Sequence, residues 1–279
     1  MSLIELKNVT YQYPLDPEPM IKNLSVMFEK GKVYGLIGRN QSGKTTLCNI
    51  IRGFIPTLFF GELTGEVSFR NHSIDSYNIG ALAAEIGYAA QNPFTQISGV
   101  KETVEEELAY SMENLGIARS VMQKKVNELI ELFRLEELRL KNPYELSGGQ
   151  KQRVALASIM ALDPEVIILD EPTSQLDPQS TEEIFEIIAM LKRQGKTVLI
   201  VEHKVDLLAE YCDEIILLED GRVIKQGTTH EVFSDPCILE YGASLPQVAL
   251  FFLQQLQQEN EIPITMVEAI EKLKGAMKR

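Results

Sequence analysis

The clearest chemical signal in the sequence is a glycine-rich loop that is suited to binding phosphate. Residues 38–46 read GRNQSGKTT, which satisfies the pattern G-x-x-x-x-G-K-[ST]. An apolar run at 32–37 precedes this loop and a helical pattern at 46–53 follows it. In that context the loop N–H groups can surround a phosphate, Lys44 can neutralise the β- and γ-phosphates of ATP, and the Thr45 hydroxyl can bind Mg²⁺. The candidate nucleotide-binding residues are Gly38, Arg39, Asn40, Gln41, Ser42, Gly43, Lys44, Thr45 and Thr46.

Two adjacent carboxylates end a second apolar run. Residues 166–172 read VIILDEP, so Asp170 and Glu171 are predicted at the C-terminal edge of a buried strand, where open α/β sheets bind ligands. Asp170 can hold Mg²⁺ through its water shell, and Glu171 can orient or deprotonate a water in line with the γ-phosphate. Alone, the pair is equally consistent with a strand that ends in two solvated acids. The phosphate loop favours a metal–nucleotide site.

A third element, at residues 146–150, reads LSGGQ and opens another helical pattern. Ser147, Gly148 and Gly149 leave a helix N-terminus bare enough for a phosphate to approach, although a glycine-rich N-cap alone would look the same. The order of the three elements along the chain is more distinctive than any one of them. LSGGQ between a phosphate loop and VIILDEP resembles the signature sequence of ABC transporter ATPases.

This resemblance covers residues 1–232 and implies roles for further residues. It implies that Gln91 contacts Mg²⁺ and the attacking water, that His203 contacts the γ-phosphate, and that Tyr13 stacks on adenine. It also implies that SQLD, at residues 174–177, lies at the seam of a dimer. The implied catalytic residues are Glu171, His203 and Gln91; the metal site is Thr45, Gln91 and Asp170; and Ser147, Gly148, Gly149 and Gln150 bind the nucleotide held by a partner subunit.

Alternatives remain open for the aromatic and the histidine. Tyr11 alternates with Tyr13 on one predicted strand, so either ring can belong to the core, and stacking needs an exposed ring face. His203 is also consistent with a structural histidine at a strand end. His72 and His230 are interpreted as surface residues. Gln41 is unusual, because many related loops carry glycine there and a side chain is disfavoured where φ is positive.

A narrower resemblance extends over the whole chain. TVEEELAYSMENLGI, at residues 103–117, and a tail with ASLPQVALFFLQQL resemble the ATPases of energy-coupling factor (ECF) transporters. Those ATPases drive uptake of vitamins and transition-metal ions. The implied partners are a second ABC ATPase subunit, identical or paralogous, a transmembrane scaffold protein and a membrane substrate-binding protein. The implied location is peripheral, at the cytoplasmic face of the cell membrane, with coupling through the region after Gln91. The segment NPFTQIS, at 92–98, departs from the more usual acidic and Leu-Phe versions.

Composition limits the competing functions. The 279 residues carry a net charge of −13, which argues against nucleic acid as the main partner because phosphate backbones need a basic face. The sequence has no signal-peptide pattern and no apolar run near the ~20 residues that span a bilayer. Three scattered cysteines are predicted to be reduced packing residues. A non-hydrolysing regulatory ABC subunit, and the ATPase of another transporter class, including an exporter, remain alternatives.

The elements that must position these residues follow from periodicity. Strands are predicted at 3–13, 23–29, 32–37, 61–71, 166–169 and 197–201. Helices are predicted from the capping pairs Thr103/Glu106 and Thr265/Glu268, and from apolar spacing at Val126, Leu129, Ile130 and Phe133, at Ile184, Ile187, Ile188 and Leu191, and at Ile270, Leu273 and Met277. We therefore predict an α/β P-loop NTPase (RecA-like) core with an antiparallel β layer. The ABC ATPase domain is predicted at 1–232, with an inserted helical subdomain at about 92–164 and a small C-terminal helical appendage at 233–279.

Overall fold

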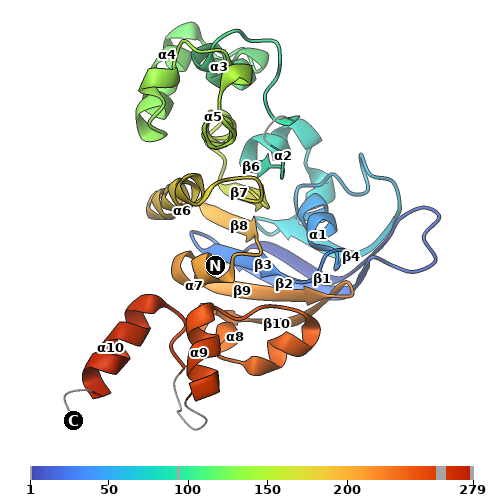
Figure 1. Ribbon diagram of the computed structural model, residues 1–279. Helices are drawn as coiled ribbons and strands as arrows, with labels where there is room; N and C mark the ends of the chain where they lie inside the picture. The colour runs from blue at the N-terminus through green and yellow to red at the C-terminus, as the bar shows by residue number, and fades with distance from the viewer. Residues whose placement is uncertain (1, 93–94, 256–261, 277–279) are drawn as a thin grey trace. The chain divides into compact units, whose positions relative to one another are not determined.

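The computed structural model describes residues 2–92, 95–255 and 262–276 (Figure 1). The chain divides into two units: unit 1 is Met1–Tyr77 with Leu199–Arg279, and unit 2 is Asn78–Val198. The boundary between them falls inside strand β8 (Thr197–Val201). Met277, which the sequence places in a C-terminal helix, and Leu256, the last residue of the tail segment ASLPQVALFFLQQL, lie outside the described residues, as do positions 93–94 of the predicted helical insertion. The predicted domain boundaries stay predictions.

Unit 1 contains an antiparallel sheet and part of a largely parallel one. The antiparallel sheet has the order β2-β1-β4-β5, and the order in the other is β10-β9-β3 followed by β8. Strands β3 and β9 are parallel, whereas β9 and β10 pair antiparallel. The expected antiparallel layer and parallel core are therefore both present. The strands are β1 (Ser2–Gln12), β2 (Ile21–Glu29), β3 (Val33–Ile37), β4 (Glu62–Phe69), β5 (His72–Ser73), β9 (Glu214–Glu219) and β10 (Arg222–Thr228).

The helices of unit 1 come after strands in the chain order, and the first of them follows the phosphate loop. All five residues of β3 are buried, as expected of a central parallel strand, and the phosphate loop leads from β3 directly into α1. At the far end of the chain, Thr265 Oγ1 accepts from Glu268 N (3.3 Å) just before α10, which confirms the predicted cap. The helices are α1 (Lys44–Ile51), α7 (Val205–Tyr211), α8 (Thr229–Phe233), α9 (Gln247–Gln255) and α10 (Met266–Ala276), with 3₁₀ turns at Ile74–Ser76 and Pro236–Tyr241.

Unit 2 is mainly helical, with a pair of parallel strands. β6 (Ile86–Ala89) pairs in parallel with β7 (Val166–Asp170), and all of β7 is buried. Helix α5 packs against α3 and against α6, so it forms the centre of the helical part. The helices are α2 (Ile79–Glu85), α3 (Val104–Asn114), α4 (Arg119–Leu132), α5 (Gly148–Met160) and α6 (Pro178–Arg193), with 3₁₀ turns at Glu136–Leu138 and Pro143–Glu145.

The capping pair predicted at the start of α3 is confirmed. Thr103 Oγ1 accepts from Glu106 N (3.4 Å), and Glu106 Oε2 accepts from Thr103 N (3.2 Å). These contacts satisfy N–H groups at the helix start that have no partner inside the helix. Thr103 therefore fixes the start of the helix that follows the region after Gln91.

Removing this cap gives a test of the local structure. We expect Thr103→Ala to lower the free energy of unfolding by about 1 kcal/mol, the usual contribution of a threonine N-cap. Thr57→Ala is the matched control, because Thr57 is exposed and makes no side-chain hydrogen bond in the described part of the chain. Urea unfolding followed by circular dichroism measures both. Equal stability of the two variants would contradict the assigned cap.

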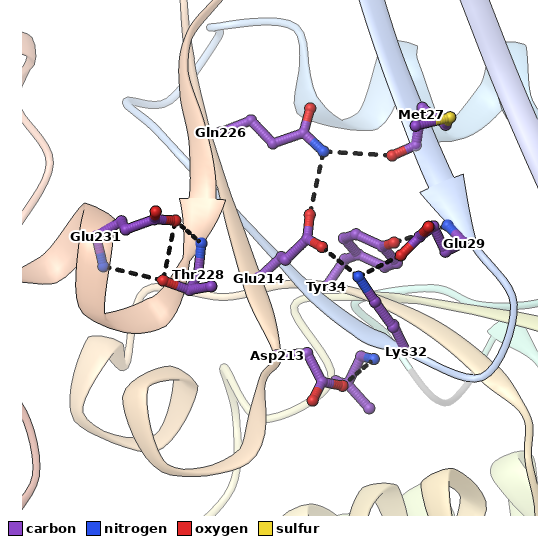
Figure 2. A network of polar contacts seen from close by, with 10 residues as sticks. Met27, Glu29, Lys32, Tyr34, Asp213, Glu214, Gln226, Thr228 and Glu231 are labelled. Atoms are coloured by element: carbon purple, nitrogen blue, oxygen red, sulfur yellow. Dashed lines mark hydrogen bonds and ion pairs between the residues drawn. The ribbon is translucent and has the colours of Figure 1, made fainter. Parts of the chain in front are cut away.

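A polar network joins four strands of unit 1 where β3 and β9 begin. Figure 2 shows Lys32 between Glu29 and Glu214; the Lys32 Nζ to Glu214 Oε1 distance is 2.7 Å. Hydrogen bonds to these carboxylates raise the pKa of Lys32, and the Lys32 ammonium lowers the pKa of Glu29. Gln226 Nε2 on β10 donates to Met27 O and to Glu214 Oε2, both at 3.3 Å. The network therefore fixes the N-terminal ends of β3 and β9, which are opposite to the end of β3 that carries the phosphate loop.

One sequence interpretation was wrong. Cys48 and Cys212 are buried, as predicted for packing residues, but Cys237 is exposed. It lies in the 3₁₀ turn Pro236–Tyr241, where its N–H donates to Asp235 Oδ1 (2.9 Å) and caps the turn. The position is set by this turn, so the Cys237 side chain has no core to enter.

Candidate functional site

The phosphate loop of unit 1 has a backbone that requires glycine at its two ends. Gly38 has φ +148° and Gly43 has φ +103°. A Cβ on Gly38 would lie 2.0 Å from Leu218 O, so a side chain there cannot fit. Gln41 has φ +66°, which confirms that it occupies a position where glycine is favoured. The loop therefore holds its shape at the cost of local strain, as is common where backbone N–H groups converge on an anion.

Two side chains of the loop are poised for an anion. Lys44 is buried, and its Nζ donates to Gly38 O (2.8 Å) and Arg39 O (2.7 Å), which holds the ammonium against the loop. Ser42 is 3% exposed, and its Oγ has no hydrogen-bond partner within the described ranges. A buried hydroxyl without a partner is costly, and a phosphate oxygen would satisfy it. Thr45, the predicted metal ligand, is exposed.

The aromatic alternative is settled for Tyr11. Tyr11 is fully buried and its hydroxyl donates to Phe60 O (2.8 Å), so it is a core residue. Tyr13 is only partly buried; its ring meets that of Tyr11 edge-on, with centroids 4.7 Å apart. The Tyr13 hydroxyl lies 3.1 Å from Thr46 Oγ1, beside the phosphate loop. The structure thus brings Tyr13 to the loop, and its stacking role stays a prediction.

His203 follows β8 in a turn that a buried carboxylate holds. His203 is exposed, and its N–H donates to Glu202 Oε2 (2.6 Å). Lys204 N donates to the same oxygen (3.3 Å), and Glu202 is only 3% exposed. Sequence reasoning missed Glu202, which orients the backbone of this turn. His72 and His230 are exposed, as predicted.

In unit 2 the two predicted catalytic residues Gln91 and Glu171 are in contact. Gln91 Nε2 donates to Glu171 Oε2 at 2.8 Å. Glu171 has φ +51°, a left-handed conformation that costs a non-glycine residue about 1–3 kcal/mol. Asp170 ends β7 and is 6% exposed, and Tyr88 Oη donates to its Oδ2 at 3.0 Å. Sequence reasoning missed Tyr88, although it lies three residues before Gln91.

The LSGGQ turn forms a well-capped helix start. Ser147 Oγ accepts from Gln150 N (3.4 Å), and Gln150 Oε1 accepts from Ser147 N (3.0 Å), so these two residues form a capping box at α5. Ser147 and Gly148 are exposed. The capping interpretation is therefore correct, and it leaves the helix N-terminus open to an anion as well.

The glycine that follows is required by a neighbouring helix. A Cβ on Gly149 would lie 2.3 Å from Ser180 Oγ. Ser180 N and Oγ in turn donate to the carboxylate of Asp177, at 2.9 and 2.8 Å, and these hydrogen bonds lower the pKa of Asp177. Ser180 thus joins the LSGGQ turn to the SQLD segment, which is a link that the sequence did not reveal.

The predicted site residues fall into two groups. Tyr13, residues 38–46 and His203 lie in unit 1, whereas Gln91, Asp170, Glu171 and the LSGGQ turn lie in unit 2. In the described parts of the chain, no cluster of three or more His, Cys, Asp or Glu side chains could hold a metal ion. A hydroxyl, a carboxylate and phosphate oxygens suit Mg²⁺, which usually keeps several waters and takes few protein ligands.

A family model described as ABC transporter matches residues 21–174, more than half of the chain. The chain belongs to the ABC transporter family. This ABC ATPase is 36% identical to the energy-coupling factor transporter ATP-binding protein EcfA of Methanocaldococcus jannaschii, over 95% of this chain and 92% of that protein. It is 33% identical to EcfA of Methanococcus maripaludis, over 100% of this chain and 98% of the relative.

Solved structures give the same result. The ABC ATPase resembles cbiO1 from Clostridium perfringens, part of the ABC transporter complex cbiONQ, with a TM-score of 0.77, 28% identity, and coverage of 92% of this chain and 96% of that one. It also resembles a dimeric ATP-binding cassette in a post-hydrolysis state bound to ADP and Pi, with a TM-score of 0.70 and 28% identity over 81% of this chain and 99% of the other.

These findings confirm the predicted fold class and the predicted enzyme class. The ABC ATPase has the P-loop NTPase fold, binds and hydrolyses ATP, and is the ATPase subunit of a transporter. Within the residues that the structure describes, no helix has the length and apolar character needed to cross a membrane.

Proposed function

We propose that this ABC ATPase powers an ECF-type importer of a vitamin or a transition-metal ion. The observation that carries the proposal is the match to EcfA of Methanococcus maripaludis over the whole chain, which includes the C-terminal appendage as well as the ATPase motifs. The likeness to cbiO1, part of a transporter complex, supports it. The ABC ATPase would act at the cytoplasmic face of the membrane, bound to a transmembrane scaffold and a membrane substrate-binding protein.

Uptake by the reconstituted complex tests this proposal. The ABC ATPase is purified from the membranes of its own organism with the proteins bound to it, and the complex is placed in lipid vesicles. We expect ATP-dependent accumulation of a radiolabelled vitamin or of Co²⁺ or Ni²⁺, together with a small membrane substrate-binding protein in the complex. Efflux, or a complex that lacks such a protein, would contradict the ECF assignment.

In the proposed reaction, the unit 1 group binds the triphosphate. The loop N–H groups, Ser42 Oγ and Lys44 Nζ bind its oxygens, and Tyr13 stacks on adenine. Thr45, Gln91 and Asp170 would hold Mg²⁺, which when bound neutralises charge on the β- and γ-phosphates. Tyr88 keeps the Asp170 carboxylate oriented by its hydrogen bond.

The unit 2 group prepares the attacking water. Glu171 accepts a hydrogen bond from Gln91, so its carboxylate is fixed in direction before the reaction. A carboxylate fixed in this way can orient a water toward the γ-phosphorus and accept its proton, while His203 donates to the γ-phosphate. Loss of the γ-phosphate as Pi then leaves ADP in the loop.

A second ABC subunit completes each site in this proposal. Its Ser147 and the N–H groups of Gly148 and Gly149 would bind the γ-phosphate from the opposite side. The open helix N-terminus at α5 supports this role, as does the dimeric state of the similar cassette with ADP and Pi. Because ATP would bridge two subunits, its hydrolysis would release them from each other.

The membrane partner would contact a polar pocket in unit 2. This pocket of 410 Å³ lies beside the region after Gln91, between β6, α3 and α5. Three residues that line it, Gln96, Ser111 and Ser158, each carry a buried polar atom (Oε1, Oγ and Oγ) with no hydrogen-bond partner in the part of the chain that the structure describes. Glu107 also lines it, 4% exposed, and accepts from Ser98 N and Oγ at 2.7 Å. Buried polar atoms without a partner are costly, so a polar side chain of a partner that inserted among them would be stabilised.

Filling this pocket tests the contact. We expect Ser158→Leu to weaken binding to the membrane subunits at least about tenfold, the effect of losing one well-buried interface contact. The isolated variant should keep its affinity for ATP. Ser120→Leu on α4 is the control, because Ser120 is exposed and outside the pocket. Wild-type assembly of Ser158→Leu, measured by co-purification at matched expression, would contradict the proposed contact.

A further inference from the structure

The phosphate loop is tied to the C-terminal appendage through Arg39, the second residue of the loop. Arg39 Nη2 donates to Glu240 O (3.4 Å), and Arg39 Nη1 lies 3.5 Å from Glu219 Oε1. Glu240 belongs to the 3₁₀ turn Pro236–Tyr241, which ends at Gly242 with φ +70°. A Cβ on Gly242 would lie 1.9 Å from Arg39 Nε and 2.8 Å from Arg39 Cγ. The arginine side chain thus lies directly against this glycine.

The backbone of the same residue holds the phosphate-binding lysine. Arg39 O accepts from Lys44 Nζ at 2.7 Å and from Ser42 N at 3.2 Å. Arg39 is therefore held at its side chain by the appendage and by Glu219, and at its carbonyl by Lys44 and Ser42. A change in the position of Arg39 would move an acceptor of the Lys44 ammonium.

The appendage also contacts helix α7, which begins two residues after His203. Asp206, three residues after His203, accepts from Gln247 N at the start of α9 (2.8 Å). Helix α8, just before the appendage, packs against β10 and β9, and the appendage helices α9 and α10 are the red segments in Figure 1. The appendage thus contacts the phosphate loop directly, and it contacts the helix that follows the His203 turn.

We propose that Arg39 is a positioning residue through which the turn Pro236–Gly242 sets the affinity of the phosphate loop for nucleotide. This inference rests on the proposed nucleotide site at residues 38–46. When the turn holds Arg39, the loop carbonyls that position Lys44 are ordered before ATP binds. When the turn releases Arg39, binding must order the loop, and that entropy cost lowers affinity. The appendage is then a regulatory element of the ATP site.

Two single variants and their combination test the link in the full-length protein. Gly242→Ala places a methyl group where Arg39 lies, and because the Arg39 side chain is 55% exposed it can be displaced into solvent. We expect Gly242→Ala and Arg39→Ala each to raise the dissociation constant for ATP about fivefold, the low end of couplings between sites. The double variant should show no further increase, because both changes break one link.

A second glycine separates this effect from backbone strain. Gly116 has φ +68°, close to that of Gly242, but a Cβ there would meet nothing within 4 Å. Gly116→Ala should lower the melting temperature without changing ATP affinity. Arg39→Ala should leave the melting temperature of the nucleotide-free protein unchanged. If Arg39→Ala instead lowered the melting temperature and left the ATP affinity unchanged, Arg39 would be only a structural contact, and the proposal would fail.

The remaining outcomes are also decisive. Additive effects in the double variant would mean that Gly242 acts independently of Arg39, which overturns the link. If Gly242→Ala does not fold, Arg39→Ala carries the test. Lys44→Ala, measured in parallel, separates the two proposals: a raised dissociation constant for ATP in Lys44→Ala, with wild-type affinity in Arg39→Ala, rejects only the appendage link. Wild-type affinity in Lys44→Ala rejects the nucleotide site itself.

Discussion

Glu171→Gln is expected to slow ATP hydrolysis at least about 100-fold while ATP still binds, because general base catalysis contributes at least that factor. The amide cannot accept the proton of the attacking water. Its size and its backbone preference match those of glutamate, and its carbonyl oxygen can still accept the 2.8 Å hydrogen bond from Gln91. The variant should therefore keep the local structure and accumulate ATP-bound dimers, since the nucleotide that joins the subunits is no longer removed.

Phosphate release and size-exclusion chromatography with ATP measure the two effects. Glu182→Gln is the matched control, because Glu182 is an exposed glutamate on α6 in the same unit. The control should hydrolyse ATP at the wild-type rate and elute as the wild type does. Normal turnover by Glu171→Gln in the assembled transporter would exclude Glu171 as the base. A slow variant that forms no ATP-dependent dimer would instead contradict the shared site.

The elements that the sequence predicted are those whose signals are local. The capping pair Thr103/Glu106 is an interaction between residues three positions apart, and it forms as expected at α3. The apolar runs of β3, β7 and β8 are continuous because each strand is buried at every position. The phosphate loop carries its own glycines, so its conformation is readable from residue types alone.

One missed hairpin had a readable local signal. Strands β9 and β10 are joined at Asp220 and Gly221, which have φ +46° and +73°. An Asp-Gly pair between two apolar runs is a strong predictor of a tight hairpin turn. The short strand β6 has a weaker sequence signal, because its four residues IGYA include a glycine and show no clear alternation of apolar and polar residues.

The contacts that organise the candidate site could not be predicted from the sequence, for a different reason. Tyr88 reaches Asp170 across 82 positions, and Arg39 reaches Glu240 across 201. Both contacts depend on strand order and register, which residue types do not encode locally. Motif recognition therefore named the candidate reacting groups, whereas Tyr88, Glu202 and Ser180, which contact those groups or their turns, became visible only in the fold.

Lys44→Ala is expected to raise the dissociation constant for ATP by between about tenfold and about 150-fold, since a hydrogen bond to a charged group contributes about 1.5–3 kcal/mol. The loop N–H groups and Ser42 Oγ would remain, so weak binding should persist. Lys44→Met should lose as much affinity, because it keeps most of the aliphatic stem and loses only the ammonium. Isothermal titration with ATP measures all of these variants.

The comparison must separate lost charge from a damaged loop, because Lys44 Nζ also donates to Gly38 O and Arg39 O. Lys124→Ala is the control for loss of a positive charge, since the Lys124 side chain is 82% exposed on α4. It should bind ATP as the wild type does. An unchanged dissociation constant in Lys44→Ala, with the protein folded, would mean that the triphosphate does not bind at this loop. Weak ATP binding with a wild-type melting temperature would assign the loss to the ammonium, because the loop would then be intact without it.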